Sequence, residues 1–352
     1  MDHTLPFIDL HRHIEGSARL ETILDLGQRF GLPLPAADLE GLRPHVQVTS
    51  PQPGVMAFIE KFKWPVGVLV NDEACRRIAY ESVEDGAGEG LDYLELRFSP
   101  WFMAEPNRLD PERVVEAVID GVAAASADTG LRVNLLGILS RTYGPEVAWK
   151  ELNVLLQHRE GIAGLDLAGD EANFPGELFV EHFKEARDAG WAITAHAGES
   201  AGPDSIWQAI KELGARRIGH AVHALDDPKL LDYMFAHGIG IEANLTSNVQ
   251  TSTVPDYPSH PLKIFLERGL LASINTDDPA ISGIDLAYEY RAAGELAGLD
   301  DVQIRQAQNN VLATAFLSAG EKQALLDRKR ELAEKGKRGE AQDRPGNPAL
   351  PA

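Results

Sequence analysis

The sequence predicts an α/β fold: a (β/α)8 TIM barrel with additional helices between its first two strands and at its C-terminus. Two observations support this prediction. Eight short apolar runs rich in β-branched residues recur along the chain, and the segments between them have helical spacing. This alternation implies a parallel sheet, and eight strands are the number that closes into a barrel. The runs span residues 6–11, 92–98, 132–139, 162–169, 191–197, 217–222, 238–243 and 271–276.

The alternative fold is an open, doubly wound parallel sheet. Such sheets commonly carry a glycine-rich dinucleotide-binding sequence directly after a strand. No such sequence follows any of the eight runs, so the barrel is favoured.

The helices are predicted from their start and stop residues. Ser17 is placed to cap a helix that follows the first run and ends at Gly31. Residues 71–90 predict the helix that leads into the second run, and residues 204–213 predict one after the fifth. Residues 303–335 have the pattern of C-terminal helices.

Two segments do not fit the alternation of strands and helices. The gap between the first two runs is too long for a simple connection, and its residues 53–69 carry several aromatic side chains. This segment either covers a pocket as a lid or packs as a helix on the flank of the barrel. The polar, proline- and glycine-containing residues 336–352 predict a disordered tail, which leaves residues 1–335 as a single domain.

The composition restricts the partners of the protein. With 54 acidic and 33 basic residues its formal net charge is −21, which repels nucleic acids. There is no apolar stretch of membrane-spanning length and no N-terminal signal segment, and the single Cys75 allows no intramolecular disulfide. We therefore expect a cytoplasmic protein that binds a small neutral or cationic molecule; no oligomeric state is predicted.

Residues that bind metals or transfer protons follow four of the runs. His11 and His13 are two residues apart on a strand, so their side chains point the same way. The others are His196 and Glu199 after the fifth run, His220 and His223 after the sixth, and Asp277 and Asp278 after the eighth. All these ends meet at the carboxyl rim of a barrel. Three histidines with the carboxylate of Asp277 would suit a catalytic zinc ion, leaving Asp278 free to contact a substrate.

Seven motifs resemble the adenosine deaminase family, particularly its bacterial members. In chain order they are HRHIEG, DLAGDE, HAGES, RIGHA, LTSNVQT, HPLK and SINTDDP, and the resemblance spans residues 5–320. It implies a zinc-dependent barrel enzyme of purine salvage. Such an enzyme hydrolyses adenosine or 2′-deoxyadenosine to inosine or 2′-deoxyinosine and ammonia.

The resemblance also implies roles for individual residues. The implied ligands of one zinc ion are His11, His13, His196 and Asp277. The metal would lower the pKa of a bound water. Glu199 would protonate purine nitrogen 1, which requires a raised pKa in a closed pocket. His220 would orient the attacking water without binding the metal.

Four residues are expected to contact the purine nucleoside. Asp278 would bond purine nitrogen 7, the Gly169 backbone amide would bond nitrogen 3, and His13 would face the substrate as well as the metal. Glu15 would meet a ribose hydroxyl; the family commonly has aspartate there, one methylene shorter. The expected supporting residues are Asp166, Asp170 and Glu171, and the histidines expected to be structural or on the surface are His182, His223, His237 and His260.

The sequence is also compatible with several other functions. Related barrels with two metals bridge them with a lysine at the end of the fourth strand, and residues 162–169 contain none, which favours one metal. Adenine, aminofutalosine or N6-modified purines are alternative substrates, although Glu15 favours a nucleoside. A catalytically inactive purine-binding or zinc-stabilised protein is the remaining alternative, and the presence of Glu199 and His220 disfavours it.

Overall fold

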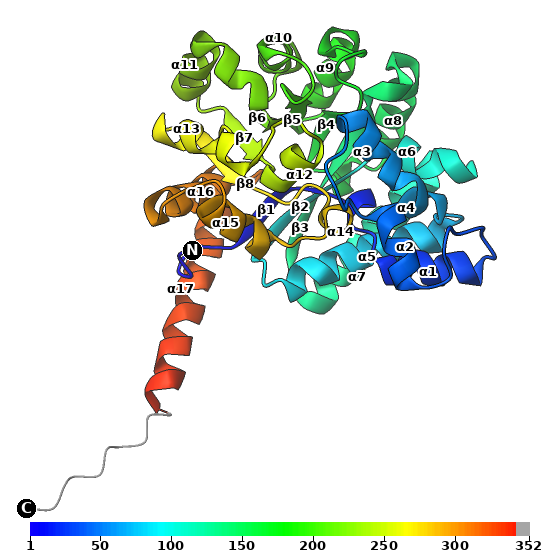
Figure 1. The fold of residues 1–352 in the computed structure, drawn as a ribbon, viewed down its shortest axis with the longest axis horizontal. Helices are drawn as coiled ribbons and strands as arrows, with labels where there is room; N and C mark the ends of the chain where they lie inside the picture. The colour runs from blue at the N-terminus through cyan, green and yellow to red at the C-terminus, as the bar shows by residue number, and fades with distance from the viewer. Residues whose placement is uncertain (343–352) are drawn as a thin grey trace, which may run out of the picture.

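The protein is a closed parallel barrel surrounded by helices, as the computed structural model shows for residues 1–342 (Figure 1). Within these residues eight strands form one sheet in chain order, each parallel to the next. They are β1 (Ile8–His13), β2 (Tyr93–Phe98), β3 (Arg132–Ser140), β4 (Gly164–Ala168), β5 (Ala192–Ala197), β6 (Arg217–His220), β7 (Gly240–Ala243) and β8 (Leu271–Ile274). The predicted fold class is confirmed, and every predicted run overlaps one of these strands.

A short seam joins the last strand to the first. Residues 12 and 277 form a parallel bridge, and Asp277 supplies two backbone hydrogen bonds across it. Its N–H donates to the carbonyl of His11 at 2.7 Å, and its carbonyl accepts from the N–H of His13 at 2.9 Å. The residue that follows β8 therefore closes the barrel.

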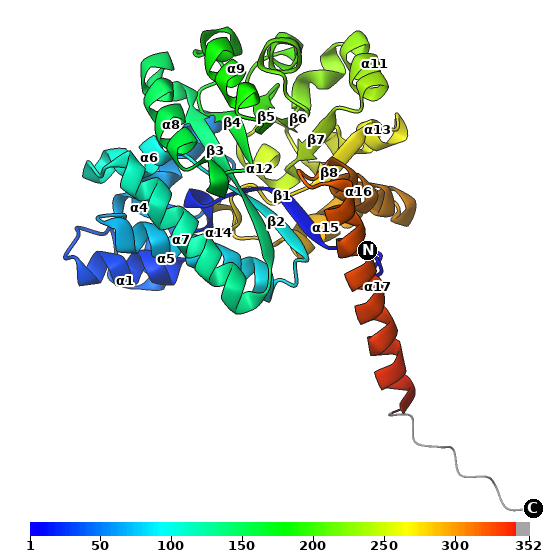
Figure 2. The same ribbon diagram turned by 180° about the vertical axis from the view of Figure 1, so that it is seen from behind.

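Helices cover the outside of the barrel, as the view from behind also shows (Figure 2). The larger ones are α1 (Leu20–Arg29), α2 (Leu39–Val46), α5 (Asp72–Gly88), α7 (Pro111–Thr129), α8 (Pro145–Gln157), α9 (Val180–Asp188), α11 (Pro228–His237), α15 (Leu286–Glu295), α16 (Asp301–Thr314) and α17 (Ala319–Gln342). The shorter ones are α3 (Val55–Ile59), α4 (Lys63–Gly67), α6 (Pro100–Ala104), α10 (Pro203–Gln208), α12 (Leu245–Gln250), α13 (Leu262–Glu267) and α14 (Pro279–Ser282). None of the helices in the described part of the chain is long and apolar enough to cross a membrane.

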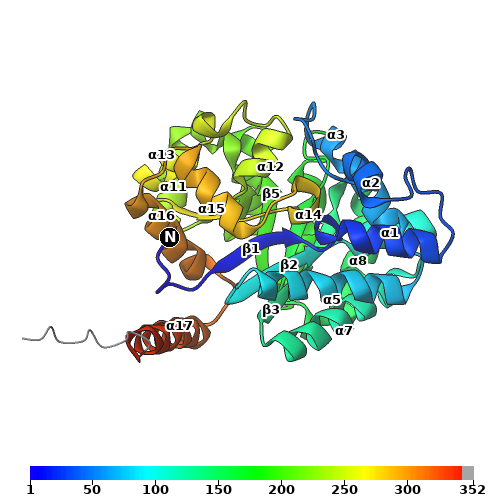
Figure 3. The ribbon, with the colours of Figure 1, turned by 60° about the horizontal axis from the view of Figure 1, so that its bottom comes forward.

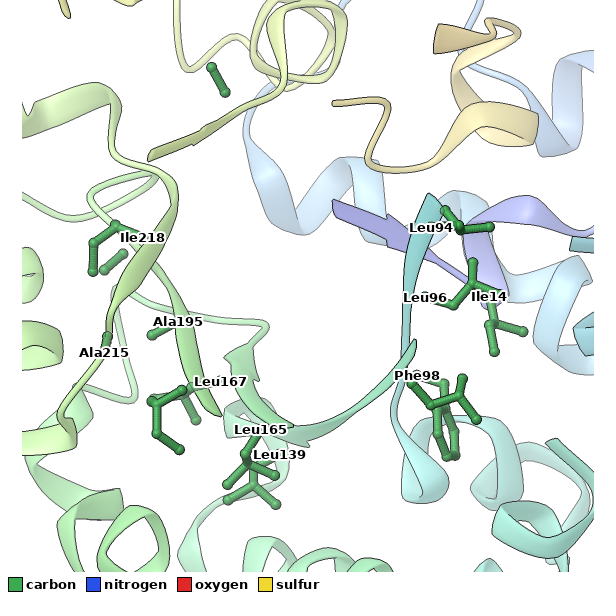
Figure 4. Close-up of a cluster of buried hydrophobic side chains, with 14 of the residues drawn as sticks. Ile14, Leu94, Leu96, Phe98, Leu139, Leu165, Leu167, Ala195, Ala215 and Ile218 are labelled. Carbon is green, nitrogen blue, oxygen red and sulfur yellow. The ribbon is translucent and has the colours of Figure 1, made fainter. Parts of the chain in front are cut away.

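The apolar core lies between the strands and the outer helices, whereas the barrel interior is polar. Along β2, Leu94, Leu96 and Phe98 belong to the buried hydrophobic cluster (Figure 4). The residues between them, Glu95 and Arg97, form buried ion pairs with charged residues of other strands. Alternate strand residues point to opposite faces, so one side of each strand builds the core and the other builds a charged interior.

The long connection between β1 and β2 combines both predicted arrangements. Side chains of α3, among them Val55 and Phe58, line a cavity at the carboxyl end of the barrel, as expected for a lid. Val66 of α4 packs into the main hydrophobic cluster, as expected for a helix on the flank. Figure 3 shows α3 and α2 on the same side of the molecule as α14.

Three predicted boundaries can be compared with the structure. Ser17 does not cap a helix: its hydroxyl donates to the carbonyl of His13 at 2.6 Å, and α1 begins only at Leu20. The helix predicted over residues 204–213 is present as α10 and one π-helical turn, and Gly214 ends it with a φ of 81°. Helix α17 continues through Gln342 into the predicted tail, because Ala, Glu, Lys and Arg are strong helix formers; residues 343–352 lie outside the described residues.

Candidate active site

Four side chains converge at the carboxyl end of the barrel interior. His11 and His13 come from β1, His196 from β5, and Asp277 from the turn after β8. The Nε2 atom of His196 lies 3.1 Å from Nε2 of His11 and 3.3 Å from Nε2 of His13. The Oδ1 atom of Asp277 lies 3.1 Å from Nε2 of His11 and 3.2 Å from Nε2 of His13. The structure thus brings together the four ligands expected from the sequence.

Two buried carboxylates orient two of these rings. The Nδ1 atom of His11 lies 2.6 Å from Oε2 of Glu242, and Nδ1 of His196 lies 3.0 Å from Oδ2 of Asp166. Burial opposes the charge of Glu242, but Arg97 and a second arginine hold its pKa well below the ordinary value. Burial likewise opposes the charge of Asp166, whose pKa is held well below the ordinary value by His196 and Arg97. Both carboxylates are therefore ionised acceptors, and both rings donate to them from Nδ1.

The donor set fits a metal ion. With their Nδ1 protons directed at these carboxylates, the neutral rings of His11 and His196 would present Nε2 lone pairs to each other and to Asp277. Such a cluster is unfavourable in a buried place unless a cation lies between the donors. Their separations of 3.1–3.3 Å are close to the roughly 3.3 Å expected for ligands about 2.0–2.1 Å from a tetrahedral ion.

His220 lies at the edge of this cluster. A donor atom of His220 is within 4.8 Å of donor atoms of His11, His196 and Asp277. Its Nε2 atom is 3.7 Å from Oδ2 of Asp277, farther than the contacts of 3.1–3.3 Å that link His11 and His13 to His196 and Asp277. The ring is fully buried and lines the same cavity.

Glu199 faces the cavity from the loop that follows β5. Burial, together with the charges of Asp277 and Glu171, raises the pKa of Glu199 well above its ordinary value and so favours the protonated carboxyl. The loop is fixed by Glu171, whose carboxylate accepts the backbone N–H groups of residues 198–201 at 2.6–3.1 Å. This contact matches the supporting role expected for Glu171.

Asp278 directly follows Asp277 in the chain. Burial, followed by the negative charge of Asp277, raises the pKa of Asp278 well above its ordinary value. Its side chain lines the cavity, and its Oδ1 atom has no hydrogen-bond partner within residues 1–342. A Cβ atom at Gly16 would overlap this carboxyl group, so the glycine makes room for it. The protonated form, which the raised pKa favours, would offer the cavity both a hydrogen-bond donor and an acceptor.

Glu15 occupies the neighbouring wall. Its Oε1 atom accepts the backbone N–H of Ser99 at 2.8 Å, whereas its buried Oε2 atom finds no partner among the described residues. Burial raises the pKa of Glu15 to about 7. Ser99 is held in turn by Glu151, which accepts its hydroxyl at 2.6 Å. Glu15 therefore has one oxygen atom, Oε2, that can accept a further hydrogen bond, while Ser99 and Glu151 hold its side chain in place.

The rest of the cavity wall combines a close backbone approach with an apolar surface. Gly169 has a φ of 111°, and a Cβ atom there would collide with the Thr142 hydroxyl. Opposite the polar groups, the wall is formed by the apolar side chains Val55, Phe58, Ile59, Phe62 and Phe102. A flat ring with polar edges, such as a purine, matches this combination of surfaces.

The cavity gathers nearly all residues selected from the sequence. Its lining includes His13, Glu15, Gly169, His196, Glu199, His220, Asp277 and Asp278. His11 does not line the cavity; it is fully buried and contacts His196 and Asp277 of the cluster. His182, His223 and His237 bond to protein groups elsewhere, in keeping with the structural or surface positions expected for them.

One important group was not found from the sequence. Glu242 lies within β7, and it contacts His11, Arg97 and Arg217 in the barrel interior. A signal existed, because a charged residue is unusual in a parallel strand that is buried on both faces. The run GIGIEA shows this single charge between Ile241 and Ala243.

A parallel barrel with these histidines at the ends of β1 and β5 and this aspartate after β8 defines a metal-dependent hydrolase of the amidohydrolase type. The sequence model of the adenosine deaminase family matches residues 6–332. An adenosine deaminase from Edwardsiella ictaluri is 58% identical over 329 residues, which cover 94% of this chain and 99% of that protein. The chain therefore belongs to the adenosine deaminase family.

Solved structures show the same fold. The crystal structure of an adenine deaminase from Arthrobacter aurescens has a TM-score of 0.86 and 26% sequence identity, covering 94% of this chain and 99% of that one. The N6-methyl-AMP deaminase from Arabidopsis thaliana has a TM-score of 0.80 and 25% identity, covering 95% of this chain and 98% of that one. These relatives deaminate different 6-aminopurine compounds according to their names.

Proposed function

We propose that this chain hydrolyses adenosine and 2′-deoxyadenosine to the corresponding inosines and ammonia, as an enzyme of purine salvage. The observation that carries the proposal is the convergence, at one cavity, of a cluster of histidine and aspartate side chains and a buried carboxyl group with a raised pKa. The similarity to adenosine deaminases over nearly the whole chain supports the same reaction. The lone, buried Cys75 fits the reducing cytoplasm where we place this reaction.

One zinc ion is the metal that the donor set fits best. Its proposed ligands are His11, His13, His196 and Asp277. Three imidazoles with a carboxylate, and room for a further ligand, are typical of catalytic zinc sites. When bound, the ion supplies the acidity that makes hydroxide available from water at neutral pH.

Glu199 acts on the purine ring. Attack at carbon 6 requires the ring to accept electrons, and the proton of Glu199 transferred to nitrogen 1 makes that carbon electrophilic. The raised pKa of Glu199 provides this proton at neutral pH. His220 orients the attacking water at the other side of the cavity.

The remaining groups hold the nucleoside. Asp278, which keeps its proton, donates to purine nitrogen 7, and the backbone N–H of Gly169 donates to nitrogen 3. His13 contacts the substrate beside the reacting carbon. The free Oε2 atom of Glu15 accepts a ribose hydroxyl. This last contact favours nucleosides over the free base.

The experiment is a panel of purines assayed for ammonia release and for loss of the adenosine absorbance band. Adenosine and 2′-deoxyadenosine are expected as good substrates, with adenine, AMP and N6-methyl-AMP much poorer. Strong chelation is expected to abolish turnover, and zinc to restore it. Preference for adenine, aminofutalosine or a modified purine would replace the substrate assignment, and no ammonia from any purine would indicate a binding protein.

A further inference from the structure

Three buried side chains, those of His220, Asn248 and His260, form a row that leads from the active site into the protein. Asn248 belongs to α12 and His260 precedes α13, and both are buried. The amide Nδ2 of Asn248 lies 2.9 Å from Nδ1 of His220. The Nε2 atom of His260 lies 3.1 Å from Oδ1 of Asn248, and the backbone N–H of Leu262 lies 3.1 Å from Nδ1 of His260.

The direction of every hydrogen bond in this row follows from its far end. A backbone N–H can only donate, so Nδ1 of His260 must accept from Leu262. Burial lowers the pKa of His260 to about 3, which keeps the ring neutral and leaves its one proton on Nε2. That proton is donated to Oδ1 of Asn248. The amide group is thereby oriented with its NH2 toward Nδ1 of His220, which must accept.

We propose that the Leu262 amide, His260 and Asn248 fix His220 as the tautomer that carries its proton on Nε2. Asn248 and His260 are then positioning residues, which act on the reaction only through His220. The effect on catalysis rests on the proposed function, whereas the tautomer itself does not.

Other neighbours of His220 do not select a tautomer. The Nδ2 atom of Asn244 is 3.4 Å from both ring nitrogens, so it does not distinguish between them. Glu199 Oε1 is 3.6 Å from Nδ1, beyond a strong hydrogen bond. Asn248, at 2.9 Å from Nδ1, makes the shortest of these contacts and is itself held in one orientation.

The tautomer decides what His220 can do. With a proton on Nε2, the ring can donate a hydrogen bond to the water that attacks the purine. Asp277 Oδ2, 3.7 Å from Nε2, is too far away to accept a strong hydrogen bond. It has no lone pair at Nε2 to offer a metal. This proton would distinguish His220 from His11 and His196, although these three rings and Asp277 lie close enough together to share a metal ion. The opposite tautomer would expose that lone pair and remove the donor.

The test begins with the tautomer in the zinc-loaded enzyme. Two-bond 1H–15N correlation spectra of protein labelled with 15N-histidine distinguish the two tautomers, and His220→Gln identifies the His220 signals. We expect a protonated Nε2 and an unprotonated Nδ1 on His220. An unprotonated Nε2 would overturn the proposal, whether or not the enzyme deaminates adenosine. The expected tautomer in a protein that deaminates no purine would support the proposed orientation of His220 and would refute only the proposed function.

Asn248→Asp reverses the last hydrogen bond, because a carboxylate only accepts. We expect Nδ1 of His220 to become protonated and kcat for adenosine to fall by about 10²–10³-fold, the usual effect of losing an oriented donor. The zinc content should not change, and KM should change by less than about threefold because Asn248 does not touch the substrate. Asn309→Asp, on the exposed face of α16, adds the same charge and should leave both readouts unchanged.

His260 provides a rescue experiment. His260→Gln keeps a donor within reach of Asn248 Oδ1 and should retain kcat within about threefold, whereas His260→Met fills similar space without a donor and should lose roughly tenfold or more. His237→Met, at an exposed position, is the matched control. If Asn248→Asp and His260→Met both keep the original tautomer and near-normal kcat, Asn248 and His260 do not position His220, and the proposal is wrong.

Discussion

At the scale of single residues, strain is concentrated where the chemistry is proposed. His220, Ala221 and Asp277 have left-handed backbone conformations, with φ values of 66°, 53° and 64°. A side chain with a Cβ atom makes this conformation costly by about 1 kcal/mol or more per residue. Two of these residues face the cavity. The sharp turns aim their side chains across the barrel mouth, where a relaxed strand end would point them elsewhere.

The two neighbouring aspartates should be separable by substitution. Asp277→Asn is expected to lose zinc together with activity, because Asp277 lies within 3.2 Å of two histidine nitrogens of the cluster. Asp278→Asn should keep about one zinc per chain and bind purine more weakly, since its hydrogen bond to the base is changed. Metal analysis and substrate titration measure the two effects. Equal loss of metal in both variants would contradict this division.

Glu199 should control turnover through its proton. Glu199→Gln is expected to fold and bind zinc normally while kcat falls by roughly 10²–10⁴-fold. In the unmodified enzyme the raised pKa favours the protonated carboxyl, and this proton is lost as the pH rises. The alkaline side of the kcat profile should therefore decline. Turnover of Glu199→Gln close to that of the unmodified enzyme would assign the proton donor elsewhere.

Glu15 should discriminate against a 5′-phosphate in a way that depends on pH. Its pKa of about 7 makes it neutral below that value and negative above it, so repulsion of AMP grows as the pH rises. The ratio of kcat/KM for adenosine to that for AMP should therefore increase between about pH 6 and about pH 8.

The phosphate of AMP also titrates near pH 6, so Glu15→Gln serves as the reference. This variant should use AMP relatively better and show a weaker dependence of the ratio on pH. An identical pH dependence in both proteins would remove Glu15 from substrate selection.

At the scale of secondary structure elements, the connection between β1 and β2 both lines the cavity and packs against a neighbouring helix. Phe62 follows α3, lines the cavity and packs against Phe102 of α6, with ring centroids 5.6 Å apart. Phe58 of α3 packs on the other side of Phe62, with ring centroids 6.1 Å apart. The aromatic cluster therefore ties the cavity wall to two elements instead of leaving α3 as an independent cover.

Removing one ring of this aromatic cluster should weaken the binding of the substrate. Phe62→Ala is expected to raise KM for adenosine by about tenfold, with a smaller change in kcat, and to lower the free energy of unfolding by roughly 3 kcal/mol. Steady-state kinetics and denaturant unfolding measure these effects. Phe235→Ala, at an exposed position on α11, is the control. An unchanged KM in Phe62→Ala would show that this wall does not hold the substrate.

The elements also explain what can be predicted from the sequence. Parallel strands that are buried on both faces appear as short apolar runs, which is why all eight were found. The pair His11 and His13 was visible because its members are two residues apart. Glu242 looked like one polar residue in an ordinary strand. The contact between His220 and Asn248 joins residues 28 positions apart, and His260 lies farther along still, so only the folded chain shows the row they form.

At the scale of the whole molecule, buried carboxyl groups link stability to pH. Burial raises the pKa of Glu151 to about 7 and that of Glu289 to about 8. In the unfolded chain both would lose their protons above about pH 4.5. The folded state thus holds more protons between that value and about pH 8. These groups therefore make the protein less stable as the pH rises through this window.

Glu289→Gln should reveal one such contribution. The amide cannot ionise, so the fall in the free energy of unfolding with pH should become shallower by at most about 1.4 kcal/mol per pH unit. Denaturant unfolding at several pH values measures the slope. Glu267→Gln, at an exposed position, is the control. Parallel curves for Glu289→Gln and the unmodified protein would exclude Glu289 as a source of the pH dependence.

The seam between β8 and β1 has a consequence for how the enzyme is made. Asp277 both closes the barrel and completes the donor cluster, and its partners His11 and His13 belong to β1, seven strands before β8 in the chain. A growing chain that ends before β8 exposes histidines without the carboxylate. The full donor set therefore forms only once β8 is in place, because the backbone hydrogen bonds that close the barrel also bring Asp277 to His11 and His13.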